Sequence, residues 1–286
     1  MDTPSSIVSA PAPTPARPFL RWAGSKRLLL KQIEPHLPDT YSRYIEPFLG
    51  GGSLFLRLRP HNALLNDACA PLAATWNAVG QDPQLVHEYA TRLELNEANY
   101  YAERPRSDGT PAEQAGRFIF LNSGAFGGIY RVNRAGGFNV PWGKPKTGHT
   151  VDLKNLEQVA HTLQKGQLQV QAEDFESLLA DAGTGDLVFL DPPYVTTHNS
   201  NGFVDYNEKL FSWSDQERLA SAAHSAAARG AYVVVTNADH PSVEALYEGF
   251  KLYKMSKSST LAAVASKRKT VSELLMVGHP RLTRLK

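Results

Sequence analysis

A run of four apolar residues, Leu187 to Leu190, ends directly on an aspartate and constrains the fold more than any other feature. A run with no alternating polar residues is typical of a strand buried on both faces. A second such run, Tyr232 to Val235, ends near Asn237, and shorter strands are expected at Tyr44–Ile45 and Ala63–Leu65. Buried strands of this kind belong to parallel sheets, whose two faces are both covered by helices.

Helical patterns separate these strands. Apolar residues have helical spacing from Arg27 to Ile33, and Pro35 and Pro38 are expected to end that helix. Further helices are expected over Leu54–Leu58 and Ser214–Ala228, the second opened by a serine N-cap. The alternation of strands and helices predicts an α/β fold with an open parallel sheet.

Local composition divides the chain into a tail, a large domain and an insert. Residues 1–18 are rich in Pro, Ala, Ser and Thr, which predicts a disordered tail. Residues 81–150 show helical patterns without a buried-strand signal, so we interpret them as a smaller, mainly helical inserted domain. The sheet domain then comprises residues 19–80 and 151–286, and a chain of 286 residues is long enough for both.

Composition excludes several classes of protein. The formal net charge is only +2, which excludes a uniformly basic coat but allows a basic face. Cys69 is the single cysteine, so no disulfide forms within the chain, and a reducing cytoplasm fits. No apolar run approaches the ~18–20 residues of a membrane span, and a secretory leader is not expected. The nine histidines have no metal-site spacing, so no metal is predicted.

The segment Glu46–Ser53 contains three consecutive glycines between a predicted strand and a predicted helix. Glycines there let the backbone turn tightly and approach a ligand next to a helix N-terminus. Asp67 follows Gly52 by fifteen residues, at the end of the next strand, where an acid can accept hydrogen bonds from ribose hydroxyls. A structural turn with a capping aspartate is an equal alternative. A P-loop is excluded because no Gly-Lys-Ser/Thr follows, and Phe55 replaces the third glycine of a dinucleotide fingerprint.

Asp191-Pro192-Pro193-Tyr194 follows the apolar strand Leu187–Leu190, at the end of a parallel sheet where ligands bind. An exocyclic amino nitrogen of adenine or cytosine is a poor nucleophile, because its lone pair is delocalised into the ring. The Asp191 carboxylate and a proline-fixed carbonyl can accept its N–H groups, which localises the lone pair toward a methyl donor. Pro192 and Pro193 fix the turn and remove two competing donors, and Tyr194 offers a face for an extruded base.

The segment Phe19–Lys26 combines aromatic, small and basic residues before the first predicted helix. By itself it indicates a tryptophan packed at a domain edge with a solvated lysine. In this order, however, the three motifs resemble the Dam-type (D12 class, alpha group) DNA adenine-N6 methyltransferase family over nearly the whole chain after the tail. The resemblance implies a Rossmann-like sheet, S-adenosylmethionine as cofactor, and transfer of its methyl group to adenine N6 in double-stranded DNA by base flipping.

The resemblance also implies a role for each motif. Asp191, Pro192, Pro193 and Tyr194 would be catalytic. The implied cofactor-binding residues are Trp22, Ala23 and Lys26 at the methionine end, Glu46, Phe48, Gly50 and Gly52 around the cofactor, Asp67 at the ribose, and Asp174 and Phe175 at the adenine.

Within the insert, the segments Leu121–Asn133 and Gly137–Gly143 resemble the DNA-reading loop of the family. Arg131 would read a guanine edge bidentately, and Phe126 or Ile129 would wedge between bases. Gly127 departs from the pattern, because members that recognise GATC carry Asn there, so a GATC target does not follow from the resemblance. The remaining predicted DNA-binding residues of this loop are Asn133 and Pro141. A glycine-rich loop with solvated arginines is the alternative.

A basic cluster precedes the last predicted strand, Val271 to Val277, and is a candidate for phosphate contact or a solvated face. Its members are Lys254, Lys257, Lys267, Arg268 and Lys269. The expected partner is double-stranded DNA in a bacterial or phage-like cytoplasm, in association with the nucleoid and with no obligatory protein partner. Two alternatives stay open: N4-cytosine methylation, which uses the same chemistry, and a non-catalytic DNA-binding module.

Overall fold

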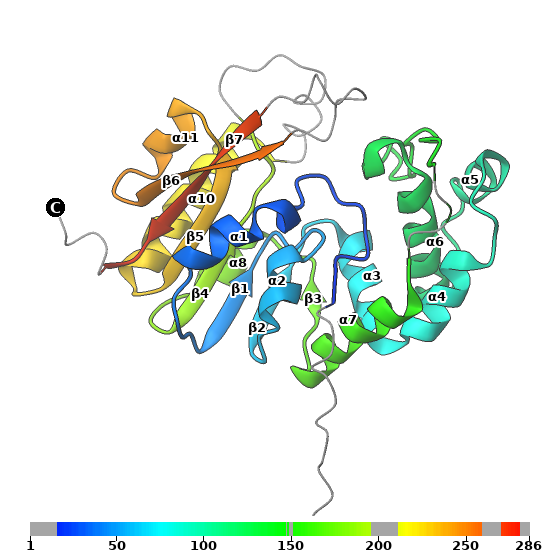
Figure 1. Cartoon of the computed structure of the whole chain (residues 1–286), viewed down its shortest axis with the longest axis horizontal. Helices are drawn as coiled ribbons and strands as arrows, with labels where there is room; N and C mark the ends of the chain where they lie inside the picture. The colour runs from blue at the N-terminus through cyan, green and yellow to red at the C-terminus, as the bar shows by residue number, and fades with distance from the viewer. Residues whose placement is uncertain (1–15, 147, 149–150, 196–210, 259–269, 281–286) are drawn as a thin grey trace, which may run out of the picture.

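The computed structural model describes residues 16–146, 148, 151–195, 211–258 and 270–280. Within these residues, a seven-stranded sheet lies beside a group of helices (Figure 1). The strand order is β3-β2-β1-β4-β5-β7-β6. The strands are β1 (Arg43–Glu46), β2 (Ala63–Asn66), β3 (Val170–Gln171), β4 (Asp186–Leu190), β5 (Tyr232–Ala238), β6 (Lys251–Ser258) and β7 (Thr270–Gly278).

Five strands, from β3 to β5 in the sheet order, pair in parallel, which confirms the predicted α/β fold. The other two, β6 and β7, are antiparallel, so the parallel sheet is extended at this edge by an antiparallel pair. β6 and β7 pair along their whole length, and β7 continues the sheet by pairing with β5. Neighbouring antiparallel strands need no helical crossover between them. β6 was not predicted, because Lys251, Lys254 and Lys257 interrupt its apolar residues.

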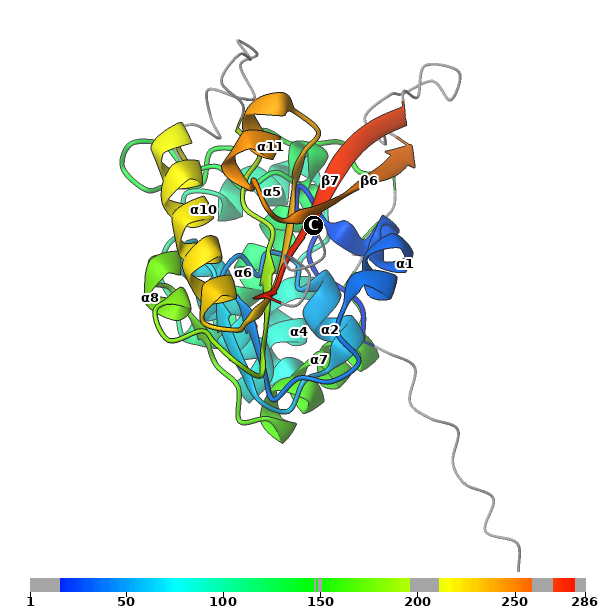
Figure 2. The same ribbon diagram turned by 90° about the vertical axis from the view of Figure 1, so that its left-hand side faces the viewer.

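Helices cover both faces of the sheet, as Figure 2 shows with the strands seen between them. Successive residues of β4 alternate between two apolar clusters: Leu187 and Phe189 belong to one, Val188 and Leu190 to the other. This alternation explains why the strand has no polar position. The second cluster lies under α8 (Phe175–Leu179), α10 (Trp213–Ala228) and α11 (Pro241–Leu246). The first lies under α1 (Leu30–Ile33), α2 (Ser53–Leu58), α3 (Ala70–Gln81) and α7 (Leu153–Lys165).

Two predicted helix boundaries need correction. The helix expected from Arg27 to Ile33 is broken into a 3-10 turn (Lys26–Leu28), α1, and a second 3-10 turn (Glu34–His36). Pro35 lies in the first turn of that last segment, where its missing N–H has no helical partner to lose. α10 begins at Trp213, one residue earlier than expected, and its N-cap is Ser212, which forms a capping box with Asp215.

Three further helices form a lobe beside the sheet: α4 (Pro83–Thr91), α5 (Glu97–Glu103) and α6 (Pro111–Gly124) (Figure 1). Val86, Ala90 and Ile119 of this lobe belong to the same apolar cluster as one face of the sheet. The lobe is therefore packed onto α3 and α7 through a continuous core. The boundaries at 81 and 150 stay a prediction.

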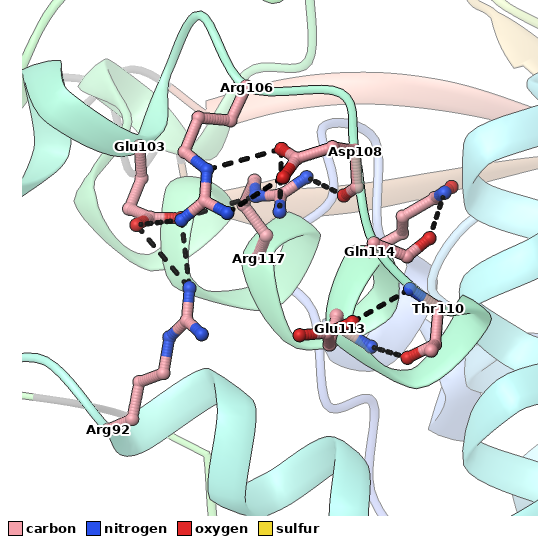
Figure 3. Close-up of polar contacts among 9 residues, drawn as sticks. Arg92, Glu103, Arg106, Asp108, Thr110, Glu113, Gln114 and Arg117 are labelled. Atoms are coloured by element: carbon pink, nitrogen blue, oxygen red, sulfur yellow. Dashed lines mark hydrogen bonds and ion pairs between the residues drawn. The ribbon is translucent and has the colours of Figure 1, made fainter.

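A buried ion-pair network fixes the loop between α5 and α6 (Figure 3). The Glu103 carboxylate, nearly buried, accepts hydrogen bonds from Arg92, Arg106 and Arg117 at 3.1 to 3.4 Å. Arg117 is also buried and donates to the backbone carbonyl of Asp108. Because a buried guanidinium needs a counter-charge, Glu103 stabilises the base of the lobe.

The strand order creates a switch point between β1 and β4. The chain runs outward through β1, β2 and β3 and then returns to place β4 on the other side of β1. Loops leaving the carboxyl ends of two such strands diverge, and ligands of open α/β sheets bind in the crevice between them. Glu46 ends β1 and Asp191 follows β4, so two of the predicted motifs flank this point.

Candidate active site

The loop after β1 is held by the end of β2. The backbone N–H of Gly50 donates to Asp67 Oδ2 at 2.8 Å, and the N–H of Cys69 donates to Asp67 Oδ1 at 3.0 Å. Gly50 and Gly52 both have positive φ, +49° and +62°. A carboxylate with two amide donors orders this loop, and each of its oxygens retains a lone pair for a ligand.

Two tryptophans pack against the same glycines. A Cβ on Gly50 would lie 2.7 Å from Trp22 Cδ1, and a Cβ on Gly52 would lie 2.7 Å from Trp76 Cη2. The Trp76 indole N–H also donates to the Gly50 carbonyl at 3.0 Å. The two glycines are thus required both by backbone conformation and by close approach. Through Trp22, the segment Phe19–Lys26 contacts the glycine loop Glu46–Ser53.

Three acids lie near one another at the carboxyl ends of β1, β2 and β4. Burial raises the pKa of Glu46 well above its usual value, against a hydrogen bond from Tyr44, and the charges of Asp191 and Asp67 add to the rise. Burial raises the pKa of Asp67 to about 6, against the two amide hydrogen bonds that stabilise its carboxylate. Such perturbed acids in one place are typical of functional sites.

Lys26 joins the N-terminal motif to the end of β4. Its ammonium lies 2.6 Å from Asp191 Oδ1, donates to the Gly24 carbonyl at 2.8 Å, and is only 3% exposed. Thr236 of β5 donates its hydroxyl to the same oxygen, Asp191 Oδ1, at 2.7 Å. Burial raises the pKa of Asp191, while the ion pair with Lys26 and the bond from Thr236 oppose that rise. Both donors meet Oδ1, which orients the carboxylate in one direction.

Tyr194 lies beside this ion pair. Its hydroxyl donates to Glu273 Oε2 at 2.8 Å, and the Lys26 ammonium lies 4.7 Å from the centre of its ring. Burial raises the pKa of Tyr194 well above its usual value, and the negative charges of Asp191 and Glu273 raise it further. The hydroxyl is therefore a neutral donor, and a cation covers one face of the ring.

The turn between Asp191 and Tyr194 is held from behind. Gln216 of α10, fully buried, donates its side-chain amide to the Pro193 carbonyl at 3.0 Å. Asn237, which is also fully buried near the end of β5, donates to Gln216 Oε1 at 3.0 Å. A buried polar chain with every member paired fixes the turn in one conformation.

Aromatic side chains line the other side of the switch point. The Phe48 ring lies 5.6 Å from Phe175 and 5.5 Å from Phe211, between ring centres. Arg218 lies over Phe175 and pairs with Asp174 Oδ1 at 2.9 Å. Asp174 is the N-cap of α8 and is half exposed. An apolar patch with an acid at its edge suits a planar ring that carries an amino group.

The predicted DNA-reading loop forms a narrow hairpin after α6. Isolated bridges join Ala125 to Trp142 and Val132 to Phe138. The Tyr100 hydroxyl donates to the Val140 carbonyl at 2.9 Å and ties the hairpin to α5. The loop therefore has a defined frame, although the described residues form no continuous strand there.

Two predicted DNA-reading side chains lie at the surface of the hairpin. Phe126 is 61% exposed. Arg131 is exposed, and its Nε and Nη2 donate to the side-chain and backbone oxygens of Asn139 at 2.8 and 3.2 Å. One edge of the guanidinium is thereby held, which leaves the Nη1–Nη2 edge for another acceptor. Gly127 has φ +65°, a conformation that Asn tolerates.

Asn122 links the hairpin to the N-terminal motif. Its side chain accepts from the Arg21 N–H at 2.8 Å and donates to the Arg21 carbonyl at 2.9 Å. Trp22 continues the contact by stacking near Phe118 and Tyr130, with ring centres 6.3 and 6.0 Å apart. Because Lys26 follows four residues later and pairs with Asp191, the hairpin and the acid at the end of β4 are joined through one short segment.

Comparison with known proteins identifies the family of the chain. The family model of D12 class N6 adenine-specific DNA methyltransferases matches residues 22–261. A type II methyltransferase of Lactococcus lactis subsp. cremoris, M1.LlaDCHI, is 32% identical over 271 residues, which cover 92% of this chain and 95% of that protein.

Two other relatives match over similar lengths. A type II methyltransferase of Methanocaldococcus jannaschii, M.MjaIII, is 32% identical and covers 92% of this chain and 99% of its own length. The DNA adenine methylase of Escherichia coli is 30% identical, with 92% of this chain and 96% of the relative covered. The chain belongs to the D12 class of N6 adenine-specific DNA methyltransferases.

Membership of this class decides between the alternatives that the sequence left open. The family acts on adenine N6, so N4-cytosine methylation is set aside, and the chain is an adenine-specific DNA methyltransferase rather than a non-catalytic module. Among the described residues, no helix has the length and apolarity needed to cross a membrane. No group of three potential metal ligands occurs within those same ranges.

The structure of the methyltransferase brings most predicted site residues together, with some exceptions. Ala23 is exposed and Pro192 is buried beneath the turn. Asn133 accepts from the N–H groups of Ala135 and Gly137, so its side chain stabilises the hairpin turn. Ile129 is half-buried and Pro141 is exposed. The predicted phosphate contacts Lys267, Arg268 and Lys269 lie outside the described residues, as do residues 1–15 of the predicted tail.

Lys254 and Lys257, the described members of the basic cluster, are both paired with acids. Lys254 pairs with Asp239 at 3.0 Å, and Lys257 pairs with Glu273. Lys254 remains two-thirds exposed, whereas Lys257 is 23% exposed. Phosphate contact therefore stays a prediction that fits Lys254 better than Lys257.

Sequence reasoning missed several residues that hold the site. Thr236 and Asn237 had a usable signal, because they follow an apolar strand as Asp191 does. Glu273 also had a usable signal, since it is the single charged residue in the last predicted strand, Val271 to Val277. Gln216 and Asn122 lie in ordinary helical sequence and carry no such signal. Their roles arise from contacts between segments far apart in the chain.

Proposed function

We propose that this methyltransferase transfers the methyl group of S-adenosylmethionine to N6 of an adenine extruded from double-stranded DNA. The observation that carries the proposal is the Asp191 carboxylate, oriented by Lys26 and Thr236 beside Tyr194 at the end of β4. A fixed acceptor next to an aromatic face suits an exocyclic amino group on a planar base.

The residues around the switch point fit S-adenosylmethionine. Glu46 and Asp67 supply acceptors for ammonium and ribose hydroxyl groups, and the rings of Phe48 and Phe175 supply an apolar surface for the adenine. Asp174, half exposed at the edge of that surface, could accept from the adenine amino group. When bound, S-adenosylmethionine supplies a methyl group made electrophilic by its sulfonium.

Asp191 acts on the target amino group. Oδ1 is already engaged by Lys26 and Thr236, so Oδ2 is the oxygen assigned to accept the N–H of adenine N6. Accepting this hydrogen bond draws the nitrogen lone pair out of conjugation and toward the methyl donor. The interaction strengthens as positive charge develops on the nitrogen, so it stabilises the transition state more than the bound substrate.

Tyr194 holds the extruded base. Lys26 covers one face of its ring, which leaves the opposite face for the adenine. Base–aromatic stacking contributes about 1–3 kcal/mol, which offsets part of the cost of removing a base from the duplex. Gln216 and Asn237 keep the turn in place while the base enters.

The hairpin after α6 supplies the contact to DNA. Its exposed Phe126 suits insertion between bases, and Arg131 presents one free guanidinium edge to a guanine. Incubating the protein with duplex DNA and S-adenosylmethionine carrying a tritiated methyl group tests the proposal. Nucleoside analysis of the product should give N6-methyladenine, and unlabelled DNA or N4-methylcytosine would refute it.

A further inference from the structure

We propose that Glu273 is a positioning residue for methyl transfer, acting through Tyr194 and Lys26. The inference deepens the proposed function and rests on it. Glu273 lies on β7, the antiparallel strand outside all three sequence motifs, and its register partner on β5 is Ala238. Glu273 is only 3% exposed, so its carboxylate is buried beside the site.

One hydroxyl and two ammonium groups lie against this one carboxylate. The Tyr194 hydroxyl donates to Oε2 at 2.8 Å, the Lys26 ammonium lies 3.8 Å from the same oxygen, and Lys257 pairs with Oε1. Two of these groups belong to the residues that stack on the base and orient Asp191. Glu273 therefore contacts both the residue proposed to stack on the base, Tyr194, and the residue that orients Asp191, Lys26.

A purely structural role would not require a charge here. Leu274 and Leu275 next to it are fully buried, and an apolar residue at such a position commonly costs no stability. A buried carboxylate is retained against a desolvation cost and is compensated here by one hydroxyl donor and two ion pairs. The charge fixes the far end of the Tyr194 ring and holds the Lys26 ammonium between two acids.

The geometry assigns two consequences to this contact. The Tyr194 ring cannot turn away from the end of β4 while its hydroxyl is held, so its open face stays directed toward the base. Lys26 stays against the other face and on Asp191 Oδ1, which keeps Oδ2 for the target amino group. Removing the carboxylate would loosen the stacking face and the acceptor together.

The test uses the full-length protein with four variants: Glu273→Ala, Glu273→Gln, Tyr194→Phe and the double variant Glu273→Ala/Tyr194→Phe. Single-turnover methyl transfer to duplex DNA is measured together with the Kd for S-adenosylmethionine. Glu273→Ala should lower the transfer rate between about tenfold and about a hundredfold, the range expected when a reacting group shifts by up to ~1 Å. The Kd should change much less than the rate, because Glu273 contacts none of the residues proposed for the ribose or adenine and, of those implied for the methionine end, only Lys26, at 3.8 Å.

Glu273→Gln should recover part of the lost rate, since its Oε1 can still accept from the Tyr194 hydroxyl. Tyr194→Phe keeps the stacking face and removes only the hydroxyl, so its loss should be smaller than that of Glu273→Ala. In the double variant the two effects should combine to less than their product, because both remove the same hydrogen bond. If Glu273→Ala does not fold, Glu273→Gln and Tyr194→Phe carry the same comparison.

Asp186→Asn is the matched control. Asp186 is a buried acid at the opposite end of β4, where it pairs with Arg43 at 2.7 Å. Its substitution should lower stability without changing the transfer rate. An unchanged transfer rate in Glu273→Ala, or effects of Glu273 and Tyr194 that multiply independently, would overturn the assignment. An inactive wild-type protein would instead refute the proposed function, so the two failures are distinguishable.

Discussion

The end of β4 and the hairpin after α6 are two functional regions built in opposite ways. At the end of β4, Lys26, Asp191, Thr236 and Glu273 come from four distant segments and meet in a buried cluster. The hairpin is one continuous stretch, residues 125–143, whose frame is made by its own backbone. Of its exposed side chains, Asn133 and Arg131 also hydrogen-bond within the hairpin, whereas Phe126 is 61% exposed.

The difference reflects what each region is proposed to do. Groups that stabilise developing charge act best when they are fixed and shielded from water, so each member of the buried cluster depends on the others. A surface that reads a base sequence needs exposed side chains on a rigid frame, and those side chains can change without unfolding it. The buried cluster should therefore tolerate few substitutions, and the surface of the hairpin should tolerate many.

The largest expected effect concerns the base of the lobe that carries the hairpin. Glu103→Ala removes the buried counter-charge of Arg117 and leaves it only the exposed Asp108, so it should lower the free energy of unfolding by about 3–5 kcal/mol. Urea unfolding measures this. Asp108→Ala is the matched control, because Asp108 pairs with Arg106 and Arg117 but is 67% exposed, and its loss should be much smaller. Equal losses would show that the buried network does not hold the lobe.

The next effect concerns chemistry. Asp191→Asn keeps the size of the side chain and loses its charge, so methyl transfer should slow by about 10²–10³, typical for an electrostatic group at a reacting centre. Binding of S-adenosylmethionine, followed by calorimetry, should stay largely intact, since the interaction is made chiefly in the transition state. A large loss of cofactor affinity with normal transfer would place Asp191 in the cofactor site instead.

A smaller effect is expected for sequence reading. Arg131→Ala should relax discrimination at one guanine by about 1–3 kcal/mol, the value of a bidentate contact. Arg134→Ala, an exposed arginine of the same hairpin, serves as the control and should leave discrimination unchanged. Arg268→Ala should differ from both, because a phosphate contact weakens binding to all sequences equally and reduces its salt dependence. Competition between target and near-target duplexes distinguishes these outcomes.

The smallest effect is a pH dependence of cofactor binding. Burial raises the pKa of Asp67 to about 6. The carboxylate is the form proposed to accept ribose hydroxyls, so affinity for S-adenosylmethionine should be full above pH 6 and fall as the pH drops through that value. The decline should approach about tenfold per pH unit well below the pKa. Calorimetry from pH 5 to 8 measures it, and Asp67→Asn should lack this step; an identical profile in the variant would remove Asp67 from the ribose site.

The two regions also differ in how far the sequence predicted them. The strand before Asp191 and the glycine loop before α2 were predictable, because buried parallel strands and tight turns impose strict local requirements. Contacts such as Glu273 with Tyr194 were not, because β7 joins the sheet antiparallel to β5 and no local pattern encodes that pairing. Arg131 was predicted, whereas Asn139, which holds one edge of its guanidinium, was not, because asparagine has many roles in turns.

Single-turnover methyl transfer to a target duplex and to a duplex with one altered base pair tests the central claim that chemistry and sequence reading are separate. Asp191→Asn should lower both rates by the same factor and leave their ratio unchanged. Arg131→Ala should lower the ratio of the target rate to the altered-duplex rate, because it slows transfer to the target duplex. A fully active Asp191→Asn enzyme, or an Arg131→Ala enzyme with an unchanged ratio, would contradict the account.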